Sequence, residues 1–121
     1  MKSFLMTLIT ACLLTAAPIT ITYAQNFDKA VKGYEAGDYT TAAKKFRLLA
    51  EQDYASAQFN LGLMHFKGQG VPQDYVLAHM WFNIAAASGH ENALKARDLQ
   101  ASQMTSNQIA EAQQHARDCM A

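Results

Sequence analysis

The sequence predicts an all-α domain, a short solenoid of antiparallel helix hairpins with about six helices, after an N-terminal signal peptide. Three observations predict this fold. One segment of the chain repeats at a constant offset, glycine and acidic residues occur at helix-length intervals, and no segment shows the sustained alternation of a β-strand.

The repeat joins "DYTTAAKKFRLLA", Asp38 to Ala50, to "DYVLAHMWFNIAA", Asp74 to Ala86, at an offset of 74 − 38 = 36 residues. In both segments an alanine, a phenylalanine and a second alanine recur every four residues, so they line one side of a helix. Small residues beside a large ring allow close packing of a neighbouring helix. A period in the mid-thirties with two helices per unit is typical of a helical solenoid.

The first three helices are bounded by glycine and aspartate. The first is expected from about Phe27 to Ala36, ending at Gly37 in the left-handed conformation. The second begins after the N-cap residue Asp38 and reaches about Gln52. The third covers about Tyr54 to Lys67 and ends at Gly68.

The last three helices follow the same logic. The fourth runs from about Asp74 to Ser88 and is stopped by Gly89, and the fifth spans about Glu91 to Ser102. The sixth begins at Thr105, whose spacing to Gln108 is that of a capping box, and continues to about Asp118. The fourth helix is apolar almost all round, so Trp81 and Phe82 are predicted to be core residues.

The first 24 residues have the layout of a secretory signal cleaved after Ala24. Lys2 precedes an apolar run from Phe4 to Ala17, and a small-residue site ends at Ala24. Residues 25–121 then form the mature helical domain, which we expect to be periplasmic or secreted. Two alternatives stay open: an uncleaved membrane anchor, and lipidation of Cys12 in "ITAC", which resembles a lipoprotein attachment box.

Charge and cysteine content exclude several classes of protein. The chain has 10 Lys or Arg and 10 Asp or Glu, so it has no basic excess for nucleic acid or an anionic membrane. After cleavage, Cys119 is the remaining cysteine, which rules out an internal disulfide in the mature chain. Cys119 is then either a tolerated residue near the chain end or the link of a dimer.

The segment from Ala55 to Ala93 closely resembles a unit of the Sel-one-like repeat family, which is related to tetratricopeptide repeats. The family pattern is held here by Ala57, Leu61-Gly62, Gly68, Gly70-Val71, Asp74, Ala78, Trp81, Ala85-Ala86, Gly89 and Ala93. His65 departs from it, because the family usually has tyrosine at that place. The unit from about Phe27 to Tyr54 looks like a degenerate tetratricopeptide-type repeat.

This resemblance implies a right-handed superhelix whose concave face binds a protein or peptide. The family consists mainly of adaptors, and some exported members are linked to cell-wall or host-facing roles. A few cysteine-rich members are linked to β-lactam binding, but those carry a disulfide in each repeat, which this chain lacks.

Candidate catalytic and metal-binding residues have simpler explanations. The histidines His65, His79, His90 and His115 do not fall in a recognised ligand motif, so we predict neither a metal nor a cofactor. The serines Ser56, Ser88, Ser102 and Ser106 lie at expected helix ends or turns, outside any nucleophile motif. Asp38, Asp53 and Asp74 are expected to open helices, where a carboxylate pairs with free N–H groups. The sequence therefore predicts no enzyme.

The first helix of each pair lines the inner face in tetratricopeptide-like arrays. On that analogy we predict partner-binding side chains outside the core at Lys29, Lys32, Gln58, Asn60 and Lys67. Amides and lysines can orient a partner's backbone and carboxylates. The predicted function is an exported adaptor or scaffold for a protein or peptide partner. The alternatives are a hydrolase acting on cell wall or β-lactams, and a structural envelope protein that self-associates as a homodimer.

Overall fold

The computed structural model describes residues 22–120, and within them every regular element is a helix. Residues 22–35 form the N-terminal helix. Five further helices follow: α2 (Tyr39–Ala50), α3 (Ala55–Lys67), α4 (Tyr75–Ala87), α5 (Glu91–Ala101) and α6 (Ser106–Met120). The predicted all-α architecture of about six helices is confirmed for this part of the chain. The apolar run Phe4 to Ala17, with Cys12, lies outside the described residues.

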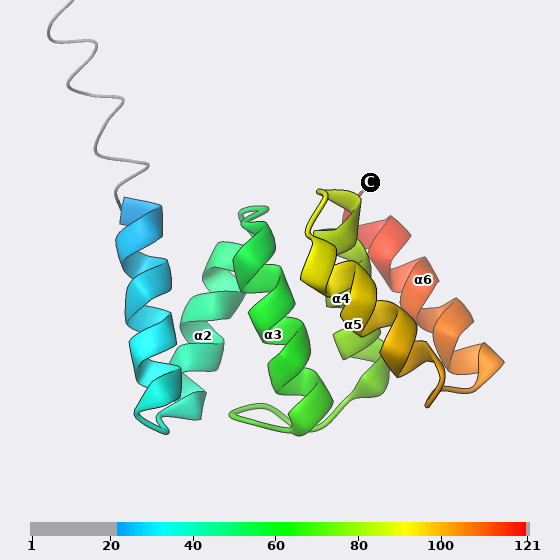
Figure 1. Ribbon diagram of the computed structural model, residues 1–121, viewed down its shortest axis with the longest axis horizontal. Helices are drawn as coiled ribbons and strands as arrows, with labels where there is room; N and C mark the ends of the chain where they lie inside the picture. The colour runs from blue at the N-terminus through cyan, green and yellow to red at the C-terminus, as the bar shows by residue number, and fades with distance from the viewer. Residues whose placement is uncertain (1–21, 121) are drawn as a thin grey trace, which may run out of the picture.

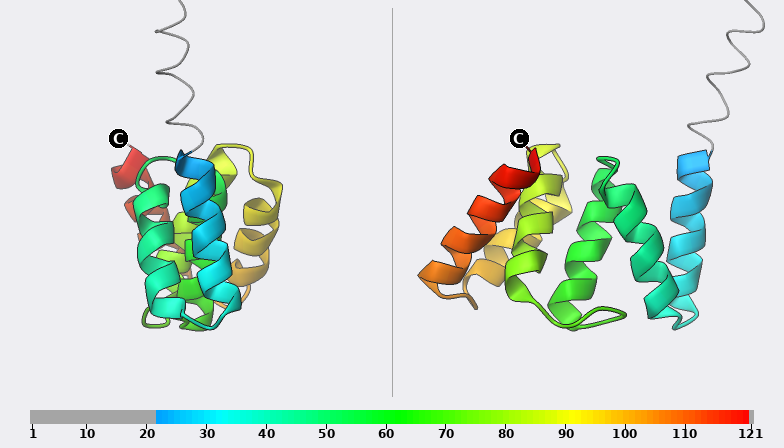
Figure 2. Two further views of the ribbon diagram at one scale, coloured as in Figure 1. Left: turned by 90° about the vertical axis from the view of Figure 1, so that its left-hand side faces the viewer. Right: turned by 180° about the vertical axis from the view of Figure 1, so that it is seen from behind.

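The helices stand side by side along the long axis of the molecule, with the N-terminal helix at one end and α6 at the other (Figure 1). Seen from the end, the N-terminal helix and α5 lie on one side, and α2 and α6 lie on the other (Figure 2). The central helix is α4, which packs against α3, α5 and α6. This explains why its sequence is apolar almost all round.

Most helix ends lie where the capping residues predicted them. The carboxylate of Asp74 accepts a hydrogen bond from the Leu77 N–H at 3.0 Å. The capping box at α6 is complete, because Thr105 and Gln108 exchange hydrogen bonds of 3.0 and 3.2 Å. Gly68 ends α3 with a φ of 70°.

Two predictions about helix starts need correction, and one N-cap was not predicted. The N-terminal helix is already helical at residue 22, five residues before Phe27, because Tyr23 packs on the core together with Phe27. Asp53 does not open α3: it lies in the α2–α3 turn with a φ of 63°, and the N-cap position is held by Tyr54. His90 is a cap that the sequence did not reveal, since its Nδ1 accepts from the Ala93 N–H at 3.2 Å.

Two apolar clusters form the core. The larger joins the N-terminal helix, α2 and α3 around Phe46 and Leu61, and the smaller joins α4 and α6 around Met80, Ile84 and Ala116. Trp81 packs against both clusters. Phe82 is 1% exposed, and a β-carbon added at Gly62 would lie 2.6 Å from its ring. Gly62 therefore leaves the space that the Phe82 ring fills, and the core assignment of Phe82 is confirmed.

The loop of residues 68–74 joins α3 to α4 within the second repeat and contacts the first. The Tyr34 hydroxyl donates a 2.7 Å hydrogen bond to Gln69 Oε1, and Val71 packs on the larger cluster. Gly70 has a φ of 73° and lies against the backbone of Tyr39, with no room for a side chain. Gly68 and Gly70 thus form a bend between α3 and α4, and this bend also contacts the preceding hairpin.

Two buried histidines carry unpartnered nitrogen atoms. His65 and His79 are 3% and 2% exposed, and the Nδ1 atom of each has no hydrogen-bond partner among the described residues. Burial lowers the pKa of His65, with a smaller lowering from Arg47, although a hydrogen bond to the Pro72 backbone and the Asp74 carboxylate oppose it. Burial and Arg97 lower the pKa of His79, opposed by Asp98. His65 therefore has the buried packing role expected of an aromatic position.

These lowered pKa values predict that acid destabilises the fold. An unfolded histidine has a pKa of about 6.5. Below that pH the unfolded chain binds protons that the folded chain does not, so the free energy of unfolding falls as the pH drops toward the lowered values. Above that pH the contribution of these histidines to the free energy of unfolding does not change with pH. Urea unfolding from about pH 7.5 to 5 tests this. The pH dependence should shrink in a His65→Tyr, His79→Gln double variant and persist in His115→Gln, which changes an exposed residue.

Candidate partner-binding site

The predicted partner-binding residues do not all lie on the surface. Lys29 and Lys32 are exposed on the N-terminal helix, and Lys32 forms an ion pair with Asp28 at 3.1 Å. Lys67 is exposed in the last turn of α3. Asn60 is half-buried, and its side-chain amide donates to the Ser56 carbonyl at 3.0 Å.

Gln58 is inside the fold, so the expectation that it lies outside the core is wrong. Its side chain is 1% exposed, and its Nε2 donates to the Ala50 carbonyl at 3.1 Å. Ala50 ends α2, and its carbonyl also accepts a 3.1 Å hydrogen bond from the Asp53 N–H in the turn that follows. Gln58 therefore joins α3 to the end of α2, a role that a polar residue in a helical sequence does not reveal.

An apolar groove lies between α3 and α5. It has a volume of about 120 Å³ and is lined by Leu63, Phe66, Phe82, Ala96, Leu99, Gln100 and Gln103. Leu99 is 72% exposed although it borders this groove. Exposed apolar side chains that gather at a concave site are typical of a docking surface.

Hydrogen bonds and ring contacts hold the walls of the groove. Gln100 is 2% exposed, and its Nε2 donates to the Tyr75 carbonyl at 2.9 Å, which ties α5 to the start of α4. Phe66 stacks on Tyr75 with ring centroids 5.3 Å apart. Since both contacts meet at Tyr75, the α3 and α5 walls are positioned by the same turn of α4.

Two of the predicted residues flank this groove. Asn60, Leu63 and Lys67 are spaced three and four residues apart, so they share one face of α3. Lys29 and Lys32 lie on another helix, and the structure does not bring them to the groove lining.

The apolar lining residues Leu63, Phe66 and Leu99 were not predicted from the sequence, because the predicted site was limited to polar side chains. The one available signal is Leu99, an apolar residue in the largely polar segment "ENALKARDLQA".

The described residues offer little for other chemistry. Residues 22–120 contain no grouping of three or more His, Cys, Asp or Glu side chains placed to hold a metal ion. Among the same residues, no helix combines the length and apolar composition needed to cross a membrane.

Stacked antiparallel helix pairs, bent at glycines and joined through their loops, define a helical-repeat protein. The family model of the Sel1 repeat matches residues 55–90, which run from α3 to the N-cap of α5. The chain therefore contains a Sel1 repeat over residues 55–90, as the resemblance of Ala55 to Ala93 predicted.

A solved structure supports the same fold. The chain is similar to a protective antigen present in uropathogenic Escherichia coli strains and described as displaying an SLR fold, with a TM-score of 0.75 and 27% sequence identity. The alignment covers 81% of this chain and 22% of that protein. The chain thus spans about a fifth of the length of the antigen, and the similarity concerns the repeat fold.

Proposed function

We propose that this chain is an exported, non-catalytic adaptor that binds a segment of a protein partner in the groove between α3 and α5. The observation that carries the proposal is Leu99, 72% exposed on the border of a groove walled by Leu63 and Phe66. An apolar side chain of the partner that enters this groove would cover Leu99. Buried apolar contacts supply most of the binding energy at such sites.

The polar side chains around the groove have a second role in this proposal. Asn60 and Lys67 share a face of α3 with Leu63, so a bound segment would pass over them. Polar contacts at a rim fix orientation and contribute less to affinity than the apolar centre does. Lys29 and Lys32 would contact the partner only if its chain continued onto the N-terminal helix.

Leu99→Asp is expected to weaken capture of the partner by about tenfold or more, because it places a charge where an apolar contact is needed. The matched control is Leu94→Asp on the same helix. Leu94 is also exposed, at 43%, and is not part of the groove lining. The measurement is quantitative pull-down from envelope extracts with both variants and the unchanged chain. Equal recovery of the same partner by Leu99→Asp and Leu94→Asp would show that the groove does not bind the partner.

Export remains part of the proposal. The charge and apolar pattern of the first 24 residues supports cleavage after Ala24 and a periplasmic or secreted location. Mass spectrometry of the exported protein tests this, with a chain beginning at Gln25 as the expected result. Incubation of the pure protein with peptidoglycan or a chromogenic β-lactam tests the non-catalytic assignment, and turnover would overturn it.

Self-association is a second candidate function, favoured by one observation. Cys119 is exposed near the end of α6, where its sulfur lies 4.0 Å from Met80 Sδ. An exported compartment permits a disulfide between two copies. Light scattering with and without reductant separates a disulfide-linked dimer from a monomeric adaptor.

A further inference from the structure

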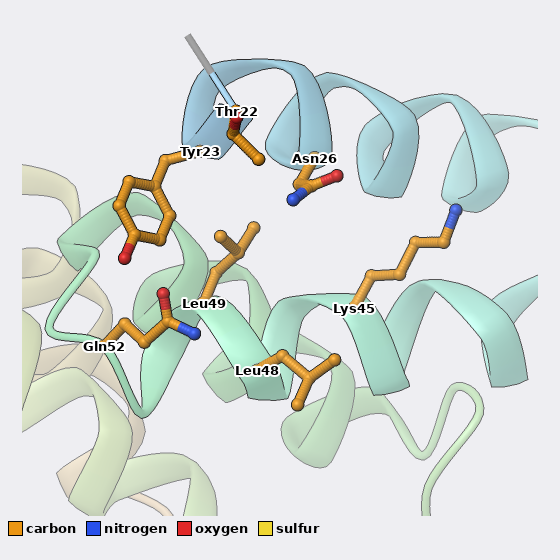
Figure 3. A pocket seen from close by; sticks show the side chains of 7 residues that line it. All are labelled: Thr22, Tyr23, Asn26, Lys45, Leu48, Leu49 and Gln52. Carbon is orange, nitrogen blue, oxygen red and sulfur yellow. The ribbon is translucent and has the colours of Figure 1, made fainter. Parts of the chain in front are cut away.

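A separate cavity of about 520 Å³ lies between the N-terminal helix and α2 (Figure 3). These two helices stand at the end of the molecule away from α6 (Figure 1). Its lining residues come from these two helices and, for Gln52, from the turn after α2: Thr22, Tyr23, Asn26, Lys45, Leu48, Leu49 and Gln52. The volume is in the range of small-molecule sites, whereas the groove between α3 and α5 is much smaller.

One face of α2 supplies the floor of the cavity. Lys45, Leu48 and Leu49 are spaced three residues and one residue apart, so they share one face of α2, and Gln52 lies in the turn just beyond the end of that helix. In the view of Figure 3, Leu48 and Leu49 lie between Lys45 and the Tyr23 ring. Because a helix rises about 1.5 Å per residue, the helical part of the floor, from Lys45 to Leu49, is roughly 6 Å long.

The floor is apolar in the middle and cationic at one end. Leu48 is 60% exposed, although it faces a cavity rather than a flat surface. Lys45 is the charged residue of the lining, and its side chain forms no ion pair or hydrogen bond with any residue among 22–120. Asn26 and Gln52 add side-chain amides that can donate hydrogen bonds.

We propose that this cavity binds an amphiphilic carboxylate, with its apolar chain on Leu48 and Leu49 and its carboxylate on the Lys45 ammonium. The apolar chain removes an exposed leucine from water, and the carboxylate provides the counter-charge that Lys45 lacks within the protein. A cationic or neutral amphiphile can cover the exposed leucine, but it provides no counter-charge for Lys45. The charge of the headgroup therefore determines which ligand the cavity accepts.

Signal cleavage after Ala24 would leave the ligand-binding groups in place. It would remove Thr22 and Tyr23, which widens the end of the cavity opposite Lys45, and keep Asn26 and the α2 floor. The new α-amino group of Gln25 would be positively charged at neutral pH, since such groups have a pKa of about 7.7–8.0. The processed chain would thus keep the preference for an anion.

Calorimetric titration of the exported protein, with its own N-terminus, tests the proposal. The probes are decanoate and decyltrimethylammonium, each below its micelle concentration. Decanoate is expected to bind, and Lys45→Gln to raise its Kd by about tenfold, the effect of losing a charge-assisted contact in a partly desolvated site. Lys44→Gln is the matched control, because Lys44 is exposed on the same helix and does not line the cavity.

Leu48→Gln gives a second check that does not depend on charge. Leu48 is exposed, so the variant is expected to fold and to bind decanoate more weakly. The proposal is overturned by equal affinity for the two amphiphiles, by an unchanged Kd in Lys45→Gln, or by no decanoate binding up to about 1 mM, a concentration at which even a weak small-molecule site is half filled. A dimer that Leu48→Gln dissociates, without decanoate binding, would also overturn it and assign this face to a second copy.

Discussion

Phe82→Ala is expected to lower the free energy of unfolding by about 3–5 kcal/mol, a large share of the total stability of a small domain. Phe82 is 1% exposed in the central helix α4, so its removal leaves a cavity that the neighbouring helices cannot close fully. Urea unfolding measures the change. Leu48→Ala is the control, because Leu48 is 60% exposed and its truncation should cost little.

The contact between Gly62 and Phe82 makes this prediction more specific. Gly62→Ala alone should destabilise the protein, since its β-carbon would lie 2.6 Å from the Phe82 ring. In the Phe82→Ala background the ring is absent, and the added methyl group fills part of the cavity. The two changes should therefore be clearly non-additive. Additive effects, or an unchanged melt for Phe82→Ala, would contradict the packing of α3 on α4.

Gly70→Ala is expected to lower the free energy of unfolding by about 2–4 kcal/mol, the sum of a left-handed backbone penalty and a steric overlap. Gly70 has a φ of 73°, and its added β-carbon would overlap the Tyr39 carbonyl and lie 2.9 Å from the Thr40 nitrogen. Backbone atoms cannot rotate away as a side chain can. The loop of residues 68–74 would have to leave the preceding hairpin.

Gly37→Ala is the matched control for this variant. Gly37 has a φ of 84°, and its added β-carbon would meet nothing within 4 Å. Gly37→Ala should therefore lower the free energy of unfolding only by the penalty for a left-handed backbone, about 1 kcal/mol. The difference between the two variants, read from urea unfolding curves, measures the contact between the loop and α2. Equal losses would mean that the loop does not rest on Tyr39 in solution.

Local chemistry was enough to predict most of the fold. Helix caps act on backbone groups within a few residues, so their roles can be inferred from spacing alone. The examples here are Asp74, the pair Thr105 and Gln108, and Gly68. The recurring alanine and phenylalanine positions predicted the core because helical periodicity determines which side faces a neighbour. Asp53 was misassigned because aspartate tolerates both a cap and a left-handed turn.

The candidate site could be predicted only in part. Asn60 and Lys67 stay predictions as partner contacts, whereas Gln58 is buried, with its side-chain amide donating to the Ala50 carbonyl at the end of α2. The groove depends on the distance between α3 and α5, which are separated in the chain by α4. No local pattern encodes that distance, so Leu63 and Leu99 could not be recognised as neighbours from the sequence.

We propose that the chain works by binding a partner in the groove between α3 and α5. Site-specific photo-crosslinking in living cells tests it most directly, with a photoreactive residue at Leu99, at Leu48 in the end cavity, or at Gln113 on α6. We expect a discrete protein adduct from position 99 that is absent from position 113 and weak or absent from position 48. Adducts of equal strength from all three positions, or none from position 99, would contradict it.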